Sequence, residues 1–384
     1  MDFSLDETQI AARDALRRYL QAEVAPLVDR HEAEHKPVPA GVIAAMREYG
    51  LLGGLLPEDV GGFALPMTTY GTLICEVARV WPSLRSVTST SNLAASVIAD
   101  AASPELRDAF LPGILEGKTV ACFALSEPNI GSDAAHVETR AEPLPQGWRI
   151  TGRKLYISNG PIADVGVVFA RTPLSDGRQG VSCVLFESSR QGFSVTPLSK
   201  MGMHSCPLGE LLFDGVEVPA GHLLGAPGQA FSLAKKHLNV GRCVVAFSAL
   251  GIAEAALEAA VQYAKDRRQF GRPIGAFQMV QQMVADMMAL VETSRLLCYR
   301  AADALDRHAP DAALYCSMAK RHATEAVLRV AELSLQVHGG AGYTSLFPVE
   351  RYYRDARHLS IAEGTNQIQS MLVAQTALGL SALR

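Results

Sequence analysis

The spacing of apolar residues changes twice along this chain, and this limits the folds that the chain can adopt. Over residues 1–117, apolar residues recur every three or four positions, which predicts helices. Over 118–226, the chain breaks into short runs rich in β-branched and aromatic residues, separated by Gly, Pro, Asp and Ser. Over 227–384, helical spacing returns in long stretches rich in Ala, Leu and Met. We therefore expect a multidomain α+β protein, with an N-terminal helical domain, a central antiparallel β domain and a C-terminal helical domain.

Individual elements can be placed within this order. The first helix has the form of a capping box at Ser4 and Glu7, with Phe3 as a hydrophobic staple, and its apolar residues keep helical spacing as far as Pro26. Thr365 is a natural N-cap for the last helix. The other strands and helices that we expect include 41–49, 67–80, 148–150, 165–170, 181–186, 211–218, 251–265, 277–305 and 312–337.

Composition excludes several classes of protein. The 35 Lys and Arg residues are balanced by 39 Asp and Glu, so no long-range charge draws the chain to nucleic acid or to an anionic membrane. Its seven cysteines are scattered without a C-x-x-C pair, which indicates buried reduced thiols and no metal site. The acidic, polar start of the chain is unlike a signal peptide, and no apolar stretch looks long enough to cross a bilayer. We expect a cytoplasmic protein without a nucleic-acid partner, membrane insertion or metal.

Two segments of the central domain have residues that suit a ligand site. In ALSEPNIGSD (124–133), Gly131 lets backbone N–H groups approach a bound group closely. In GRKLYISNG (152–160), strand alternation puts Tyr156 and Ser158 on one face, where a ring and a hydroxyl would meet a planar cofactor. Taken alone, each segment is better explained as an ordinary turn or a half-buried strand.

Three segments of the C-terminal domain carry anion-binding or basic groups. Arg242 and Arg267 are able to hold a phosphate or carboxylate through forked hydrogen bonds. The glycines of QVHGGAGY (336–343) allow close backbone approach to a ligand, although a helix C-cap gives the same pattern. Glu363 follows two apolar residues and directly precedes a glycine, a setting in which partial desolvation strengthens a carboxylate as a base. The ordinary alternatives are surface arginines and a helix-start acid.

Together, and in this order, these segments resemble the acyl-CoA dehydrogenase family over essentially the whole chain. The similar parts are ALSEPNIGSD, KLYISNG, GRCVVAFSALGIAEAAL, YAKDRRQFGRPIGAFQ, QVHGGAGY and RDARHLSIAEGTNQIQ. The resemblance implies the fold of that family, in which the C-terminal domain is a four-helix bundle. It also implies FAD bound between the β domain and the C-terminal helices, and α,β-dehydrogenation of an acyl thioester.

The resemblance also implies a set of flavin contacts within the chain. Leu125 and Ser126 would hydrogen-bond the edge of the isoalloxazine ring. Tyr156 and Ser158, which stand where the family usually has Trp and Thr, would flank the ring. The turn at Gly131 and Ser132 would lie beside the pyrophosphate, and Ser132 would also approach the substrate's pantetheine arm.

A second set of positions matches residues that bind the FAD of a neighbouring subunit or its adenylate half. A cofactor shared in this way implies a homodimer, or a homotetramer built as a dimer of dimers. The positions are Arg267, Phe270, Gln336, Gly340, Thr365 and Gln367.

Glu363 matches the family's catalytic base. It would remove the α-proton while the β-hydride passes to flavin N5, and an electron-transferring flavoprotein would then accept the electrons. Arg242 and Gly364 match substrate-binding positions. Asn239 belongs to the same group, but many members have Asp there.

Arg85 indicates what kind of acyl group the protein accepts, because it matches a position that lines the acyl pocket in the family. An arginine here resembles the glutaryl-CoA dehydrogenases and the acyl-carrier-protein dehydrogenases of polyketide extender-unit pathways. The glutaryl pattern is incomplete, because a nearby acid of that pattern is Ala78 here. We expect a short, polar or acidic acyl group, carried on CoA or alternatively on an acyl carrier protein, while the simplest other role for Arg85 is to brace a helix end.

Two further functions remain open at this level. A flavin oxidase or monooxygenase on the same scaffold would not need Glu363, and a flavin-free binding protein would not need the flavin-facing segments.

Overall fold

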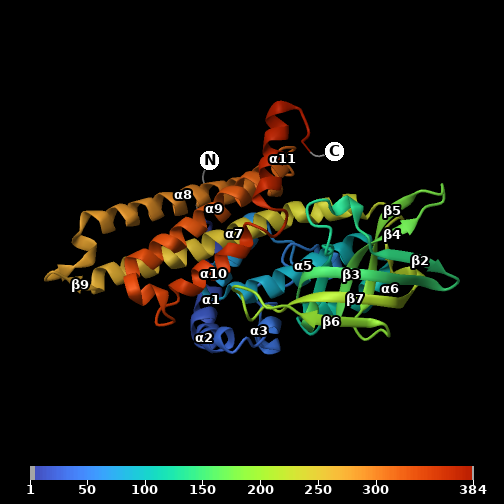
Figure 1. The fold of residues 1–384 in the computed structure, drawn as a ribbon, viewed down its shortest axis with the longest axis horizontal. Helices are drawn as coiled ribbons and strands as arrows, with labels where there is room; N and C mark the ends of the chain where they lie inside the picture. The colour runs from blue at the N-terminus through green and yellow to red at the C-terminus, as the bar shows by residue number, and fades with distance from the viewer. Residues whose placement is uncertain (1–4, 383–384) are drawn as a thin grey trace.

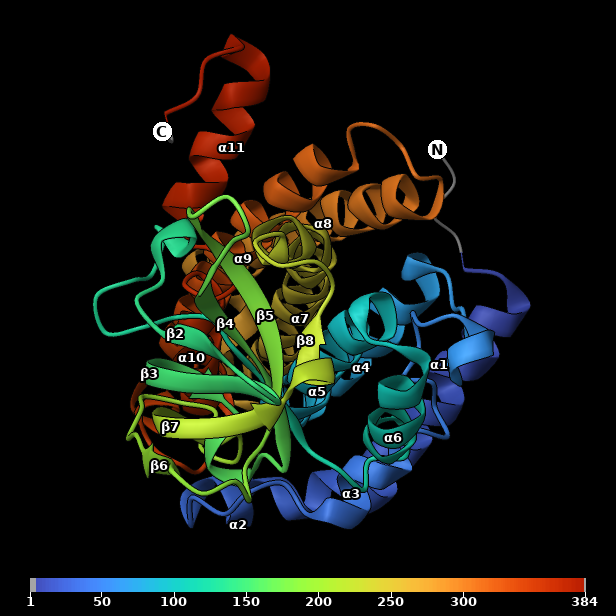
Figure 2. The same cartoon turned by 90° about the vertical axis from the view of Figure 1, so that its right-hand side faces the viewer.

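The computed structural model describes residues 5–382, in which helices and a sheet follow the predicted order (Figure 1; Figure 2). The sheet lies at one end of the molecule in Figure 1, and three long helices extend to the other end. These helices are α7 (Ala230–Asp266), α8 (Gln278–Asp306) and α9 (Ala312–His338). The expected fold class is confirmed.

The N-terminal block is helical, as predicted. A π-helical turn, Leu20–Val24, joins its first two helices. The helices of this block are α1 (Glu7–Tyr19), α2 (Ala25–Ala33), α3 (Ala40–Ala45), α4 (Met67–Val80), α5 (Pro82–Ala101) and α6 (Pro104–Leu115).

The start of this block differs from the prediction in two details. The capping box is formed by Asp6 and Gln9, whose side chains each accept a hydrogen bond from the other's backbone N–H. Ser4 and Phe3, which the sequence favoured as cap and staple, lie outside the described residues. Pro26 does not end the helix. It occupies the first turn of α2, where a missing N–H costs no hydrogen bond.

The central sheet has strand order β6-β7-β3-β2-β4-β5-β8, with β1 paired to β4. The sheet is mainly antiparallel, as expected, but β4 pairs in parallel with both β1 and β2. Such pairings join strands distant in sequence, and local patterns do not encode them. The strands are β1 (Ala121–Ala124), β2 (Arg140–Leu144), β3 (Gly147–Ser158), β4 (Val165–Pro173), β5 (Gln179–Glu187), β6 (Phe193–Pro197), β7 (Leu208–Pro219) and β8 (Leu223–Leu224).

Helix α7 begins some twenty residues before the predicted 251 and continues through two glycines, Gly241 and Gly251. A Cβ at Gly251 would lie 2.2 Å from the carbonyl oxygen of Cys75 in α4, so the glycine allows the two helices to pack closely. Helix α7 is also long and apolar enough to cross a membrane, which corrects the expectation that the chain has no such segment. However, 72% of its most apolar window is buried inside the protein, as in a core helix.

Shorter elements complete the C-terminal block. The hairpin of β9 (Arg268–Gln269) and β10 (Arg272–Pro273) lies at the end far from the sheet (Figure 1). Helix α10 (Val349–Leu359) leads towards α11 (Asn366–Leu378), which projects from the body in both views. Thr365 caps α11, accepting a hydrogen bond from Ile368 N–H at 3.3 Å, as predicted.

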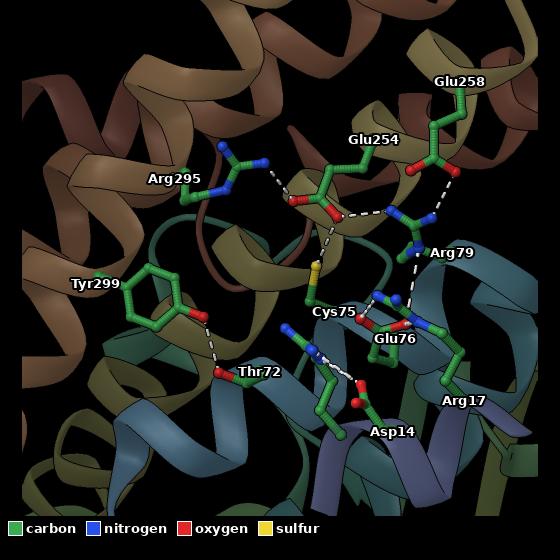
Figure 3. A network of polar contacts seen from close by, with 11 residues as sticks. Asp14, Arg17, Thr72, Cys75, Glu76, Arg79, Glu254, Glu258, Arg295 and Tyr299 are labelled. Carbon is green, nitrogen blue, oxygen red and sulfur yellow. Dashed lines mark hydrogen bonds and ion pairs between the residues drawn. The ribbon is translucent and has the colours of Figure 1, made fainter. Parts of the chain in front are cut away.

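A network of arginines and glutamates joins the N-terminal block to the C-terminal helices (Figure 3). Arg79 of α4 donates to Glu254 at 2.7 Å and to Glu258 at 2.5 Å, both on α7. Arg295 of α8 donates to the other oxygen of Glu254 at 2.9 Å, and Arg17 of α1 binds Glu76 of α4 through two hydrogen bonds. Of these pairs, Arg79–Glu254 is partly buried and crosses between the two helical blocks, so it helps to fix how they meet.

Candidate active site

Glu363 lies in the turn between α10 and α11, packed against α7. Its backbone has φ of +57°, a conformation that is costly for a non-glycine residue and that concentrates at functional sites. A Cβ at Gly241 would lie only 2.9 Å from Glu363 Oε2, so Gly241 makes room for the carboxylate. Oε2 is enclosed and has no hydrogen-bond partner within the described residues.

The surroundings of Glu363 fit a base. Burial raises the pKa of the Glu363 carboxyl above its ordinary value, which makes the ionised form a stronger proton acceptor. Nearby positive charges oppose that rise, and they come from Arg242, Arg85 and Lys320.

Arg85 of α5 is 4% exposed, and its charge interacts with that of Glu363. Its Nε and Nη2 atoms are buried and have no partner among the described residues. Burial lowers the pKa of Arg85 to about 10, which still leaves the guanidinium charged at neutral pH. A buried guanidinium without a carboxylate is costly, so this arrangement favours a ligand that brings the missing anion.

Three positive charges, including that of Arg85, act on the side chain of His358. His358 of α10 interacts with the charges of Arg85, Lys200 and Lys320, and its pKa is lowered to about 3, chiefly by burial. The imidazole is therefore neutral, and its buried Nδ1 has no hydrogen-bond partner within residues 5–382. Lys200 donates to the carbonyl oxygens of Met203 and Cys206. Cations thus outnumber Glu363 in this part of the site.

The flavin-facing candidates of the central domain lie together. The N–H of Leu155 donates to Ser126 O at 2.9 Å, which joins β3 to the turn that carries Leu125. Tyr156, 65% exposed at φ of +60°, lies where the pairing of β3 with β7 shifts register. Ser158 follows it at the end of the strand. Gly131 and Ser132 are found in the same turn segment, where a Cβ at Gly131 would meet open space.

A buried ion pair holds this turn. Lys154 is 0% exposed and donates to Glu127 Oε1 at 2.7 Å and to the Leu125 carbonyl at 3.0 Å. The Glu127 carboxylate also accepts from the N–H groups of Glu138 and Thr139. Together these bonds fix the backbone at Leu125, where the resemblance places the flavin edge.

The second cofactor set lies at the opposite end of the long helices. Arg267 is the C-cap of α7, and Phe270 in the adjoining hairpin is 93% exposed at φ of +51°. The end of α9 with Gln336 lies nearby, because His338 stacks on Tyr263 at 4.2 Å. Gly340 follows, with open space where its Cβ would be.

Arg267 and its neighbours lie far from the base along the same chain. From Arg242, beside Glu363, to Arg267, α7 rises roughly 37 Å at about 1.5 Å per residue. Thr365 and Gln367 lie with Glu363 at the start of α11 instead.

The substrate-tail candidates form a small group beside the base. Arg242 Nη1 donates to Asn239 Oδ1 at 2.7 Å, and Arg242 Nε reaches the Glu363 carbonyl at 3.4 Å. Gly364, at φ of +85°, offers its carbonyl to Lys320 and Gln369.

Sequence reasoning missed three residues of this site. Lys320 and Gln369 look like ordinary helix residues, and nothing local marks them as buried. Gly241 did leave a signal, because a glycine inside a helix costs about 1 kcal/mol relative to Ala and calls for a packing reason.

Comparison with known proteins shows which family has this arrangement of domains. The chain matches the acyl-CoA dehydrogenase N-terminal domain over 6–118, the middle domain over 122–216 and the C-terminal domain over 228–378. An acyl-CoA dehydrogenase of Bacillus subtilis (strain 168) is 37% identical over 375 residues, covering 97% of this chain and 98% of that one. The caffeyl-CoA reductase-Etf complex subunit CarC of Acetobacterium woodii is 35% identical over 366 residues, covering 94% and 95%.

A solved structure agrees. The glutaryl-coenzyme A dehydrogenase in its glutaryl-CoA complex superposes with a TM-score of 0.94 at 34% identity, over 100% of this chain and 98% of that one. This chain belongs to the acyl-CoA dehydrogenase family, whose members are flavin-dependent oxidoreductases that act on CH–CH groups of acyl-CoA.

The residues present fit FAD, the cofactor of this family. Two exposed aromatic residues with positive φ, Tyr156 and Phe270, stand at the two sets of cofactor positions. Exposed rings held in a costly backbone conformation suit contact with a planar ligand. Open space beside Gly131 and Gly340 leaves the backbone accessible.

Proposed function

We propose that this protein binds FAD and dehydrogenates a short acidic acyl thioester between its α and β carbons, with Glu363 as the base. The observation that carries the proposal is the buried guanidinium of Arg85, whose Nε and Nη2 have no partner within residues 5–382 and whose charge interacts with that of Glu363. An oxidase or monooxygenase would leave this enclosed base without a task.

Glu363 takes the α-proton in this proposal. Its enclosed Oε2 has no competing hydrogen-bond donor among the described residues. Desolvation strengthens the carboxylate, while Arg242 and Lys320 keep enough of it ionised to act. Bound FAD would supply the chemistry of accepting the β-hydride.

Arg85 binds the distal carboxylate of the acyl group. Cations exceed anions near the base, so a neutral alkyl chain would leave Arg85 buried without a partner. A carboxylate would accept two forked hydrogen bonds from the free Nε and Nη2.

FAD would be held between subunits. Leu125, Ser126, Tyr156 and Ser158 would contact the flavin, with Gly131 and Ser132 beside its phosphates. Because the far-end set lies roughly 37 Å along α7, a second copy must bring it to the same cofactor. The far-end set is Arg267, Phe270, Gln336 and Gly340. Thr365 and Gln367, which lie near Glu363 at the start of α11, would contact the adenylate half. A homodimer or homotetramer follows.

The proposal extends to carrier and partners. Asn239, Arg242, Gly364 and Ser132 would hold the pantetheine arm, which CoA and an acyl carrier protein share. The relative named for an Etf complex supports an electron-transferring flavoprotein as acceptor. We also propose a cytoplasmic location.

Anaerobic reduction of the bound flavin tests the proposal. Glutaryl-CoA should bleach the flavin absorbance, and butyryl-CoA should do so less efficiently. Faster bleaching by butyryl-CoA would contradict the proposal that the substrate is acidic. A colourless protein that does not take up FAD would contradict the whole proposed function. Light scattering that shows a flavin-loaded monomer would contradict the shared cofactor.

A further inference from the structure

One buried lysine lies beneath the turn that carries the base. Glu363 and Gly364 both have positive φ, at +57° and +85°. Lys320 of α9, 0% exposed, donates from Nζ to the Gly364 carbonyl at 2.9 Å and to Asn366 Oδ1 at 2.9 Å. Its ammonium therefore binds the backbone directly after Glu363 and the first residue of α11.

Neutral side chains complete the same network. Thr324, one helical turn along α9, donates to Asn366 Oδ1 at 3.0 Å. Gln369 Nε2 donates to the carbonyls of Glu363 at 3.2 Å and Gly364 at 3.0 Å. Lys320 differs from these three residues because it adds a charge to its hydrogen bonds.

Within residues 5–382 the ammonium of Lys320 forms no ion pair with a carboxylate. Its hydrogen-bond acceptors are a carbonyl and an amide, and burial lowers the pKa of Lys320 to about 8. The charges that face it come from Glu363, from Arg242 on α7 and from Glu325 on its own helix, and His358 of α10 also interacts with it. Of the charges that favour the protonated form of Lys320, that of Glu363 has the largest effect.

We propose that Lys320 is a positioning residue for the base: it holds the Glu363–Gly364 turn in its costly conformation and supplies a positive charge that keeps the carboxylate ionised. Lys320 acts through Glu363 and does not touch the substrate. The inference rests on the proposed role of Glu363.

The test is the pH profile of flavin reduction by a competent thioester in the FAD-loaded enzyme. A base acts when deprotonated, so the rate rises with pH through its pKa. Lys320→Met removes one of the positive charges that act on Glu363, leaving those of Arg242 and Arg85, so the part of the profile where the rate rises should move to higher pH. Lys320→Gln keeps a hydrogen-bond donor but not the charge. It should therefore shift the rising part of the pH profile as much as Lys320→Met does, while retaining more of the maximum rate of flavin reduction.

Thr324→Val is the matched control. It removes a hydrogen bond from the same network without changing charge, so it should lower the melting temperature slightly and leave the rising part of the pH profile in place. If Lys320→Met and Thr324→Val lowered the rate alike with no shift of the rising part, Lys320 would be a structural residue and the inference would fail.

A readout without substrate guards against folding effects. Because the folded pKa of Glu363 is raised, wild-type stability relative to Glu363→Gln should fall as pH rises from the ordinary carboxyl pKa to the folded one. In the Lys320→Met background this fall should extend to higher pH. An unchanged range would overturn the inference, whereas an active Glu363→Gln enzyme would overturn the proposed base itself.

Discussion

Arg79 and Arg85 lie six residues apart, on either side of Trp81, and both are largely buried, yet their surroundings are opposite. Arg79 donates to Glu254 and Glu258 (Figure 3). Arg85 has two buried nitrogen atoms without a partner among the described residues. Although burial opposes it, the bonds to glutamates raise the pKa of Arg79, whereas burial lowers the pKa of Arg85 to about 10. A paired arginine joins domains, and an unpaired one is arranged to receive an anion.

The largest effect is expected at Glu363, the proposed base, whose charge interacts with that of Arg85. Glu363→Gln keeps the size of the side chain but cannot accept the α-proton. Anaerobic stopped-flow should show flavin reduction slowed about 10²–10⁴-fold or more, with FAD still bound. Near wild-type reduction would show that another group is the base.

The paired arginine should matter for stability. Arg79→Met leaves Glu254 and Glu258 without one partner, and unfolding free energy should drop by about 3 kcal/mol, as for other broken buried pairs. Urea denaturation measures this. Glu258→Gln is the control, because Glu258 is 64% exposed and its loss should cost about 1 kcal/mol or less. Equal effects of Arg79→Met and Arg85→Met would erase the contrast between the two arginines.

The unpaired arginine should matter for selectivity. Arg85→Met should reduce kcat/KM for glutaryl-CoA by roughly 10- to 150-fold, since a charge-assisted hydrogen bond is worth about 1.5–3 kcal/mol. The loss with butyryl-CoA should be smaller, and stability should stay level or rise because a buried lone charge is gone. Equal losses with both thioesters would return Arg85 to a structural role.

The smallest effect sharpens the same contrast without catalysis. Free glutarate should bind at Arg85 and so raise the melting temperature of the wild type. When the glutarate concentration equals its Kd, the free energy of unfolding should increase by roughly 0.4 kcal/mol. Arg85→Met should lose this shift, and Arg79→Met should keep it. A shift that survives in Arg85→Met would place the anion elsewhere.

The sequence predicts the fold far better than it predicts the site's supports. The change in apolar period is local, so the order of helices, sheet and helices follows from it. The parallel pairing of β4 with β1 and β2 joins distant segments, and the early start of α7 is hidden by its glycines. Gly241 packs against Glu363, 122 positions away, and Lys320 donates to the carbonyl of Gly364, 44 positions away, and a single sequence does not show such contacts. The sequence attributed the desolvation of Glu363 to its adjacent apolar residues, but Ile361 is 56% exposed, and the carboxylate is enclosed by packing against Gly241 of α7.

The length of α7 has a genetic consequence. If each cofactor lies between the near end of one chain and the far end of another, damage to the two ends can be sorted into separate chains. A subunit with Glu363→Gln and a subunit with a defective Arg267 would each be inactive alone. In a mixed dimer, one of the two cofactors would have both defects and the other neither. Co-expression of the two inactive alleles would then restore activity, so loss-of-function alleles of this gene would fall into two complementing groups.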